Sequence, residues 1–179
     1  MTKQESLDKI FKNKSPEKKT IEETKTDKYI LKFDGCSKGN PGPSGAGAVI
    51  YKNEDVFWKS SAYVGKKETN NVAEYVGMLI GLNEAVKKNI KELHVYGDSM
   101  LVIKQMRKEY AVNSFSLKPY NKKAIELAKQ IGKVRYSHIY RDQNALADAH
   151  RLMDPLHQRP LKVALKALQL DVFRLSLLR

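Results

Sequence analysis

The chain has 179 residues, of which 33 are Lys or Arg and 20 are Asp or Glu, so its formal net charge at pH 7 is +13. A composition of 41% hydrophobic and 30% charged residues is typical of a globular protein and excludes a collagen-like or wholly disordered chain. The longest stretch without a charge, residues 39–51, contains prolines and glycines, so no membrane-spanning helix is predicted. The single cysteine, Cys36, excludes a disulfide framework and favours a reducing, cytoplasmic setting.

The chain begins with a polar segment, residues 1–28, that contains eight lysines and six acids without hydrophobic periodicity. We expect a flexible Lys-rich arm there and no secretory signal. A single domain then covers residues 29–149. Residues 29–148 contain 19 basic and 12 acidic side chains, and this excess of positive charge is compatible with a polyanionic ligand as well as with simple solubility.

Hydrophobic periodicity predicts an α/β domain. Short apolar runs bounded by turn residues predict five strands, over residues 29–33, 46–51, 56–64, 93–97 and 133–140. Apolar residues spaced by three and four predict helices over residues 70–86, 98–106 and 118–130, with a last helical region around residue 148. This order of elements predicts a mixed sheet with helices around it. Residues 39–45 are expected to form a turn-rich loop.

Four acidic residues lie near the ends of predicted elements: Asp34, Glu74, Asp98 and Asp148. Each has an ordinary structural interpretation: a turn residue before Gly35, a capping-box glutamate, a helix N-cap and an exposed helix acid, respectively. Acids at the strand ends of one sheet can also converge on one edge, and the spacing leaves that choice open. Converging carboxylates repel one another and are tolerated mainly with divalent cations, so they would predict a metal site.

Four sequence blocks carry a resemblance to a known family. They are Asp34-Gly35-Cys36-Ser37-Lys38-Gly39-Asn40-Pro41-Gly42-Pro43, Thr69-Asn70-Asn71-Val72-Ala73-Glu74, Tyr96-Gly97-Asp98-Ser99 and His138-x-x-Arg141-x-x-Asn144-x-x-Ala147-Asp148. In order and spacing they resemble the signature blocks of type 1 ribonuclease H. The resemblance implies a ribonuclease H-like fold with a five-stranded mixed sheet flanked by helices. It also implies a metal-dependent endonuclease that hydrolyses the RNA strand of RNA–DNA hybrids to 5′-phosphate and 3′-hydroxyl products.

The resemblance also implies roles for single residues. Asp34, Glu74, Asp98 and Asp148 would hold two Mg²⁺ ions, with Mn²⁺ as an alternative, and two such ions can clamp a scissile phosphate. His138 would assist proton transfer or product release, and Arg141 would contact phosphate. The alternatives are a histidine that merely ends an edge strand and a solvated surface arginine.

Substrate recognition is implied at two further places. Asn70, Asn71 and Glu74, with the backbone near Gly35 and Cys36, would contact the ribose of the RNA strand. Asn40 and Thr69 would hold a phosphate of the DNA strand. Helix capping is the structural alternative for the two adjacent asparagines, and both roles can coexist.

The chain departs from the resemblance in two regions. Residues 107–120 are too short for the extra basic helix that some relatives use to grip the hybrid. After residue 149 a basic, Leu-rich tail, residues 150–179, contains Pro155 and Pro160 where the family continues a helix. A lineage-specific closing helix, a helix that contacts a partner or membrane surface, and a reading-frame shift after Asp148 all remain open.

The leading functional hypothesis is therefore a monomeric ribonuclease H that acts on RNA–DNA hybrids. The alternative is a non-catalytic module that binds hybrids or duplex RNA on the same fold. A transposase or integrase nuclease domain is a third option, which the Thr69-Asn70-Asn71 block disfavours.

Overall fold

The computed structural model describes residues 28–144. The described elements follow one another as β1 (Tyr29–Ser37), β2 (Gly42–Lys52), β3 (Asp55–Glu68), α1 (Asn70–Lys87), β4 (Glu92–Gly97), α2 (Met100–Met106), α3 (Lys118–Ile131), β5 (Lys133–His138) and a short 3-10 helix, η1 (Arg141–Gln143). The predicted arm up to residue 27, Asp148 and the tail over residues 150–179 lie outside the described residues.

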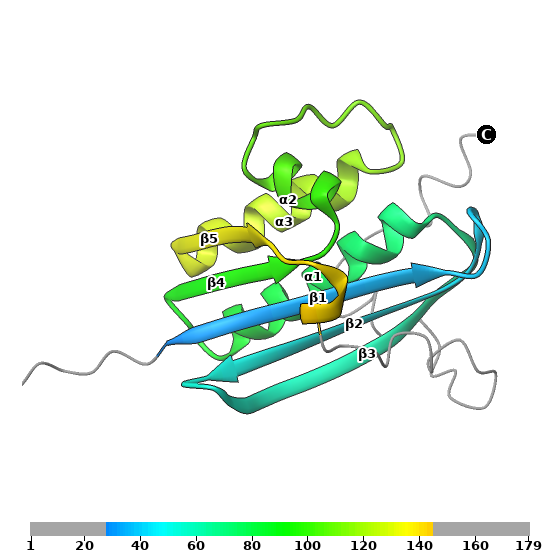
Figure 1. The fold of residues 1–179 in the computed structure, drawn as a ribbon. Helices are drawn as coiled ribbons and strands as arrows, with labels where there is room; N and C mark the ends of the chain where they lie inside the picture. Colours follow the sequence, from blue (N-terminus) through cyan, green and yellow to red (C-terminus); the bar gives the residue numbers. More distant parts are fainter. Residues whose placement is uncertain (1–27, 145–179) are drawn as a thin grey trace, which may run out of the picture.

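The five strands form one mixed sheet in the order β3-β2-β1-β4-β5 (Figure 1). The first three strands are antiparallel neighbours, whereas β4 lies parallel to β1 and β5 lies parallel to β4. The sheet and its helices confirm the predicted α/β class and strand number. Because β1 and β4 are parallel neighbours, their carboxyl ends meet at one edge, which is where open sheets of this kind place ligand sites.

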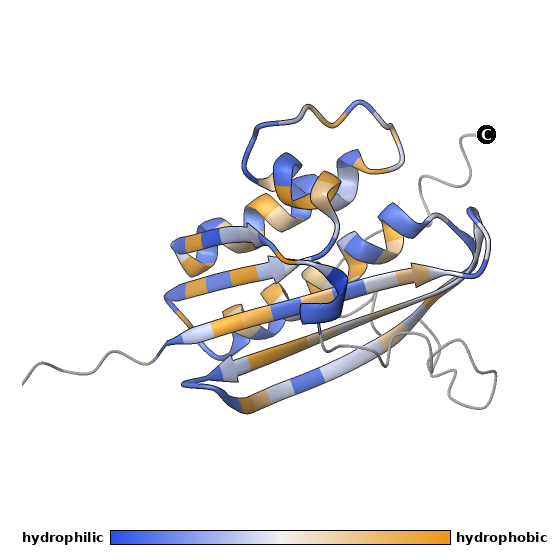
Figure 2. Ribbon diagram, viewed as in Figure 1, coloured by the Kyte–Doolittle hydropathy of each residue, from blue (hydrophilic) through white to orange (hydrophobic). Residues whose placement is uncertain are grey.

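Helix α1 forms the centre of the core. It packs on β1, β2 and β3 and against α3, and side chains such as Leu31 and Phe33 of β1 are fully buried beneath it. Apolar residues accordingly recur along the strands and along the helices that cover them (Figure 2). The helix begins at Asn70 because the Thr69 hydroxyl accepts a hydrogen bond from the Val72 amide at 3.3 Å. Among the helices in residues 28–144, none is both long enough and apolar enough to cross a membrane.

Three predicted boundaries are wrong. The expected turn at Asp34 and Gly35 is part of β1, because these two residues pair with Gly47 and Ala46 of β2 in the ladder. The loop predicted over residues 39–45 ends early, since β2 begins at Gly42. The fifth strand ends at His138, where its pairing with Gly97 ends, rather than at residue 140. In the first two cases ladder hydrogen bonds override the local preference of glycine for turns, and in the third the strand stops where its ladder stops.

Candidate metal centre and nucleic-acid interface

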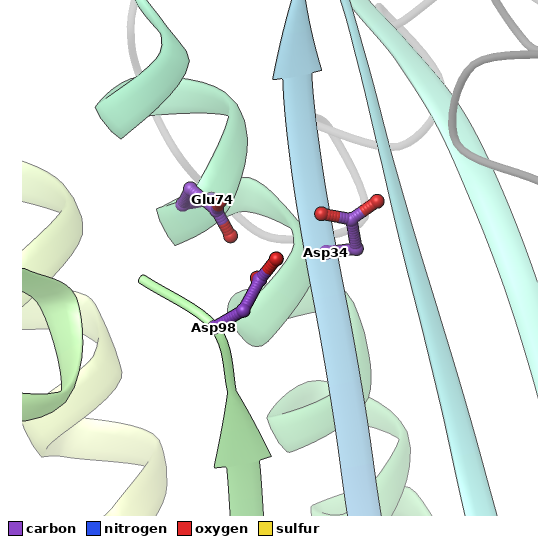
Figure 3. A group of neighbouring side chains, drawn as sticks. All are labelled: Asp34, Glu74 and Asp98. Atoms are coloured by element: carbon purple, nitrogen blue, oxygen red, sulfur yellow. The ribbon is translucent and has the colours of Figure 1, made fainter. Parts of the chain in front are cut away.

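Three of the four predicted carboxylates come together in space. Asp34 lies on β1, Glu74 lies in α1 and Asp98 directly follows β4, and one carboxylate oxygen from each residue lies within 4.8 Å of the others. The three side chains converge on the same point between the strands and the helix (Figure 3). The fourth predicted ligand, Asp148, lies outside the described residues. The convergence that sequence spacing left open is therefore present for Asp34, Glu74 and Asp98.

Two glycines allow α1 to approach β1 closely enough to form this cluster. A Cβ atom on Gly35 would lie 2.1 Å from the backbone nitrogen of Glu74, and one on Gly77 would lie 2.5 Å from the carbonyl oxygen of Asp34. Any larger side chain at either position would push the helix away from the strand. The glycine that follows Asp34 thus places Glu74 beside it.

Neither Glu74 nor Asp98 has the helix-capping role that was its structural alternative. The cap of α1 is Thr69, so Glu74 does not complete a capping box with Asn71. The cap of α2 is Ser99, whose hydroxyl lies 3.5 Å from the Val102 amide, so Asp98 is not the N-cap. Both carboxylates are therefore directed to the shared cluster instead of to a helix terminus.

Glu74 has the most unusual environment of the three. Its side chain is 4% exposed, and its Oε2 atom has no hydrogen-bond partner among residues 28–144, which the structure describes. Burial raises the pKa of the Glu74 carboxyl well above its usual value, and the charges of Asp98 and Asp34 raise it further. A buried, unpartnered oxygen beside two further carboxylates fits a divalent cation of the Mg²⁺ type, which prefers such hard oxygen ligands.

Arg141 and His138 border the cluster on the β5 side. Arg141 of η1 is close enough for its charge to oppose the rise in the pKa of both Glu74 and Cys36. The Nε2 atom of His138 lies 3.2 Å from the backbone oxygen of Asp98, which ties the imidazole to the residue that carries the third carboxylate. The structure thus brings both predicted β5-side residues to the carboxylate cluster.

Asn144 belongs to the sequence block that begins at His138, but the sequence indicates no role for it. Its buried Nδ2 atom donates to the Phe33 carbonyl at 2.9 Å and lies 3.4 Å from Oδ1 of Asp98. It thereby joins the segment after η1 to β1 and to the carboxylate of Asp98. Its place in the His138-x-x-Arg141-x-x-Asn144 block was the only sequence signal that could have identified it.

The predicted recognition residues gather at the start of α1. The Oδ1 atom of Asn40 accepts a hydrogen bond from the Asn70 amide at 3.1 Å, which brings the loop after β1 to the Thr69-Asn70-Asn71 segment. Ser37 and Ser44, which the sequence did not single out, both donate to the carbonyl of Glu68 and hold this loop in place. Asn40, Thr69, Asn70 and Asn71 therefore form one surface beside the metal centre.

Cys36 is placed differently from these polar residues. Its side chain is 3% exposed, and burial, reinforced by the charge of Asp34, raises the pKa of its thiol to about 11. The thiol is therefore protonated at neutral pH, so only the backbone of this residue is suited to a substrate contact.

Comparison with known proteins agrees with this geometry. A family model described as "Reverse transcriptase-like" matches residues 32–150. The bifunctional protein Rv2228c of Mycobacterium tuberculosis is 38% identical over 135 residues, which cover 73% of this chain but 37% of that protein. This chain therefore spans little more than a third of the length of that relative. Ribonuclease HI of Halobacterium salinarum is 32% identical over 65% of this chain and 59% of its own length.

Solved structures extend the comparison to the fold. The N-terminal RNase H domain of Rv2228c from Mycobacterium tuberculosis has a TM-score of 0.68 and 38% identity, with 72% of this chain and 95% of that chain covered. LC11-RNase H1, solved in complex with an RNA/DNA hybrid, has a TM-score of 0.63 and 35% identity over 68% of this chain and 91% of its own. With a matching family model over most of the described domain and solved relatives that share its sheet, this chain belongs to the ribonuclease H family.

Proposed function

We propose that this protein is a metal-dependent endonuclease that hydrolyses the RNA strand of RNA–DNA hybrids and leaves 5′-phosphate and 3′-hydroxyl ends. The observation that carries the proposal is the cluster of Asp34, Glu74 and Asp98 in a strongly basic chain, with a buried oxygen on Glu74 that has no partner in the described part of the chain. An acidic site of this kind repels a phosphodiester unless cations neutralise it. The ribonuclease H names of the relatives and the hybrid bound to LC11-RNase H1 support the substrate class. We propose a cytoplasmic setting and a monomeric state for the protein.

The carboxylates are proposed to hold the cations. Asp34, Glu74 and Asp98 would supply oxygen ligands, and Asp148 would supply a fourth from outside the described residues. Two bound Mg²⁺ ions, or Mn²⁺ in their place, would activate a water molecule and stabilise the departing oxygen. The protein's own contribution is to fix the three carboxylates in advance, on two neighbouring strands and a helix packed on them, so that little reorganisation accompanies the reaction.

The groups on the β5 side are proposed to act on the phosphate. The guanidinium of Arg141 would offset the negative charge of the scissile phosphate beside Glu74. The imidazole of His138, which is held near Asp98 by its contact with the backbone oxygen, would carry a proton to or from the cleaved bond. If both assignments are correct, removing either side chain should lower the rate of cleavage more than it lowers the affinity for the hybrid.

The surface at the start of α1 is proposed to recognise the two strands. The amide groups of Asn70 and Asn71 can both donate and accept, as recognition of a ribose 2′-hydroxyl requires. Asn40 and Thr69 would hold a phosphate of the DNA strand next to the helix N-terminus, where backbone amides favour negative charge. Lysine contacts to other phosphates would make binding weaken as the salt concentration rises.

The test is cleavage of a labelled RNA–DNA hybrid by the full chain, with duplex DNA and duplex RNA as controls, in magnesium and in EDTA. We expect cutting of the RNA strand of the hybrid alone, lost in EDTA and in the Asp98→Asn variant. The matched control is Asp55→Asn, which makes the same change at the exposed first residue of β3. Tight binding of the hybrid without cutting would instead establish the non-catalytic module, and failure to bind or cut it would refute the proposal.

A further inference from the structure

We propose that Tyr140 is a substrate-contact residue of the same site, whose ring packs against the sugar edge of the hybrid beside the carboxylate cluster. This inference rests on the proposed function and deepens it, because it names a recognition residue at a position that the His138-x-x-Arg141 block leaves unspecified.

The ring of Tyr140 is 71% exposed, which is unusual for a large aromatic side chain. Within the described residues, Phe115 alone among the exposed large hydrophobic side chains is more exposed, at 76%. Phe115 lies in the loop between α2 and α3, whereas Tyr140 lies between two residues of the candidate site, His138 and Arg141. An exposed aromatic residue within a site is a candidate for a binding contact.

The position of Tyr140 is determined by the end of the β4–β5 ladder. Gly97 and His138 are the last pair of this ladder, and the Ile139 amide still donates to the Gly97 carbonyl at 3.1 Å. Tyr140 therefore lies just beyond the last residue that is bonded to β4, and Asp98 likewise directly follows the end of β4. The orange segment that contains η1 and follows Tyr140 passes in front of β1 (Figure 1).

The ring and its backbone are held in place. The Tyr140 ring meets the His138 ring edge-to-face, with centroids 5.7 Å apart and an interplanar angle of 82°. The Tyr140 carbonyl accepts a hydrogen bond from the Gln143 amide at 2.9 Å. The Nζ atom of Lys32 on β1 donates to the Gln143 carbonyl at 3.2 Å and fixes this turn against the sheet. A contact surface that is ordered before binding loses less entropy when the ligand arrives.

Two cations and one acid lie in or against the turn that follows the ring. Arg141 follows directly in the chain, Asp142 comes next in η1, and Lys32 contacts the same turn, so the cations are in excess. Aromatic rings flanked by cations are the usual combination for nucleic-acid contacts, since the cations attract phosphates while the ring covers apolar surface. In a duplex the bases are stacked inside, so an exposed ring meets the sugars, which the wide minor groove of an A-like helix presents. The ligand class is therefore the ribose edge of a paired strand.

The test compares Tyr140→Ala and Tyr140→Phe with the wild-type chain in steady-state cleavage of the hybrid. Binding of the hybrid is measured in magnesium with Asp98→Asn added to each chain, so that no cleavage occurs. We expect Tyr140→Ala to raise KM and weaken binding about tenfold, the factor that 1.4 kcal/mol corresponds to, with kcat nearly unchanged. Tyr140→Phe should keep near wild-type values because the ring face is retained. Phe57→Ala, at a 41% exposed ring on β3, is the matched control and should change neither quantity.

The outcomes separate this inference from the function on which it rests. If the wild-type chain cleaves the hybrid and Tyr140→Ala has an unchanged KM and affinity, the contact does not exist while the nuclease stands. A loss confined to kcat, or a displaced pH profile of cleavage, would make Tyr140 a positioning residue for His138 and overturn the substrate contact. A wild-type chain that neither binds nor cleaves the hybrid would refute both proposals together.

Discussion

Replacing Glu74 with glutamine tests whether the carboxylate cluster is a metal site that is strained without its cations. Glutamine has nearly the same shape as glutamate but carries no charge. Two unit charges 4.8 Å apart repel by about 3 kcal/mol at an effective dielectric constant of about 20. Glu74 faces both Asp34 and Asp98, but the charge of Arg141 and partial protonation of Glu74 offset part of this repulsion. We therefore expect Glu74→Gln to stabilise the metal-free protein by roughly 2–3 kcal/mol at pH 8.

The extra stability of the Glu74→Gln variant should increase as the pH rises. In the unfolded chain Glu74 has an ordinary glutamate pKa, whereas burial and its two acidic neighbours raise the pKa in the folded protein. As the pH rises through the window between these two pKa values, the unfolded state loses the proton first, so the folded wild-type protein loses stability. Near or below the usual glutamate pKa, both states hold the proton and the difference between wild type and variant should disappear.

The assay is urea denaturation of both proteins at pH 5 and pH 8, in EDTA and in magnesium. In EDTA the variant should be more stable at pH 8 and nearly equal to the wild type at pH 5. Magnesium should reverse the order at pH 8, because an ion at about a thousand times its dissociation constant stabilises the wild-type protein by about 4.1 kcal/mol, which exceeds the advantage of the variant. A variant that is no more stable than the wild type at pH 8 in EDTA would refute the claim that the cluster is electrostatically strained.

Three other substitutions test how the fold supports the site. Gly35→Ala would place a methyl group 2.1 Å from the Glu74 nitrogen, so we expect the free energy of unfolding to fall by about 1–3 kcal/mol. Calorimetry should also show weaker magnesium binding. An unchanged magnesium affinity would contradict the close approach of α1. Asn144→Ala removes the donor to the Phe33 carbonyl and to Asp98, and kinetics should show kcat reduced about tenfold, a barrier increase of about 1.4 kcal/mol, with a nearly unchanged KM. A change in KM alone would argue against a positioning role. Tyr75→Phe removes a buried hydroxyl that donates to Gln105 Oε1 at 2.8 Å and accepts from Asn121 at 3.1 Å, so denaturation should show a loss of about 1–3 kcal/mol while cleavage stays near wild type. Equal stability would mean that this buried network contributes nothing.

The strands and helices of this protein were largely predictable because their hydrophobic periods are local. Helix α1 begins at Asn70, where the period changes from two to about 3.6, and the structure places its cap at the preceding threonine. Two of the boundary errors fall on Asp34, Gly35 and Gly42, where the residues favour turns but the structure extends the strands. Pairing with a distant strand decides such cases, and that pairing has no local signature.

For the site, too, the sequence decided some features and the tertiary structure decided others. The sequence by itself determined which acids were candidates, since they stand in blocks that resemble ribonuclease H, and it determined the excess of basic charge. Only the tertiary structure decided that Asp34, Glu74 and Asp98 meet within 4.8 Å, that Glu74 is buried with an unpartnered oxygen, and that Ser99 rather than Asp98 caps α2. It alone placed Asn144 against Asp98 and Tyr140 against His138. These contacts join residues far apart in the chain or depend on the direction of a side chain, and both follow from how α1 and the parallel strands pack together.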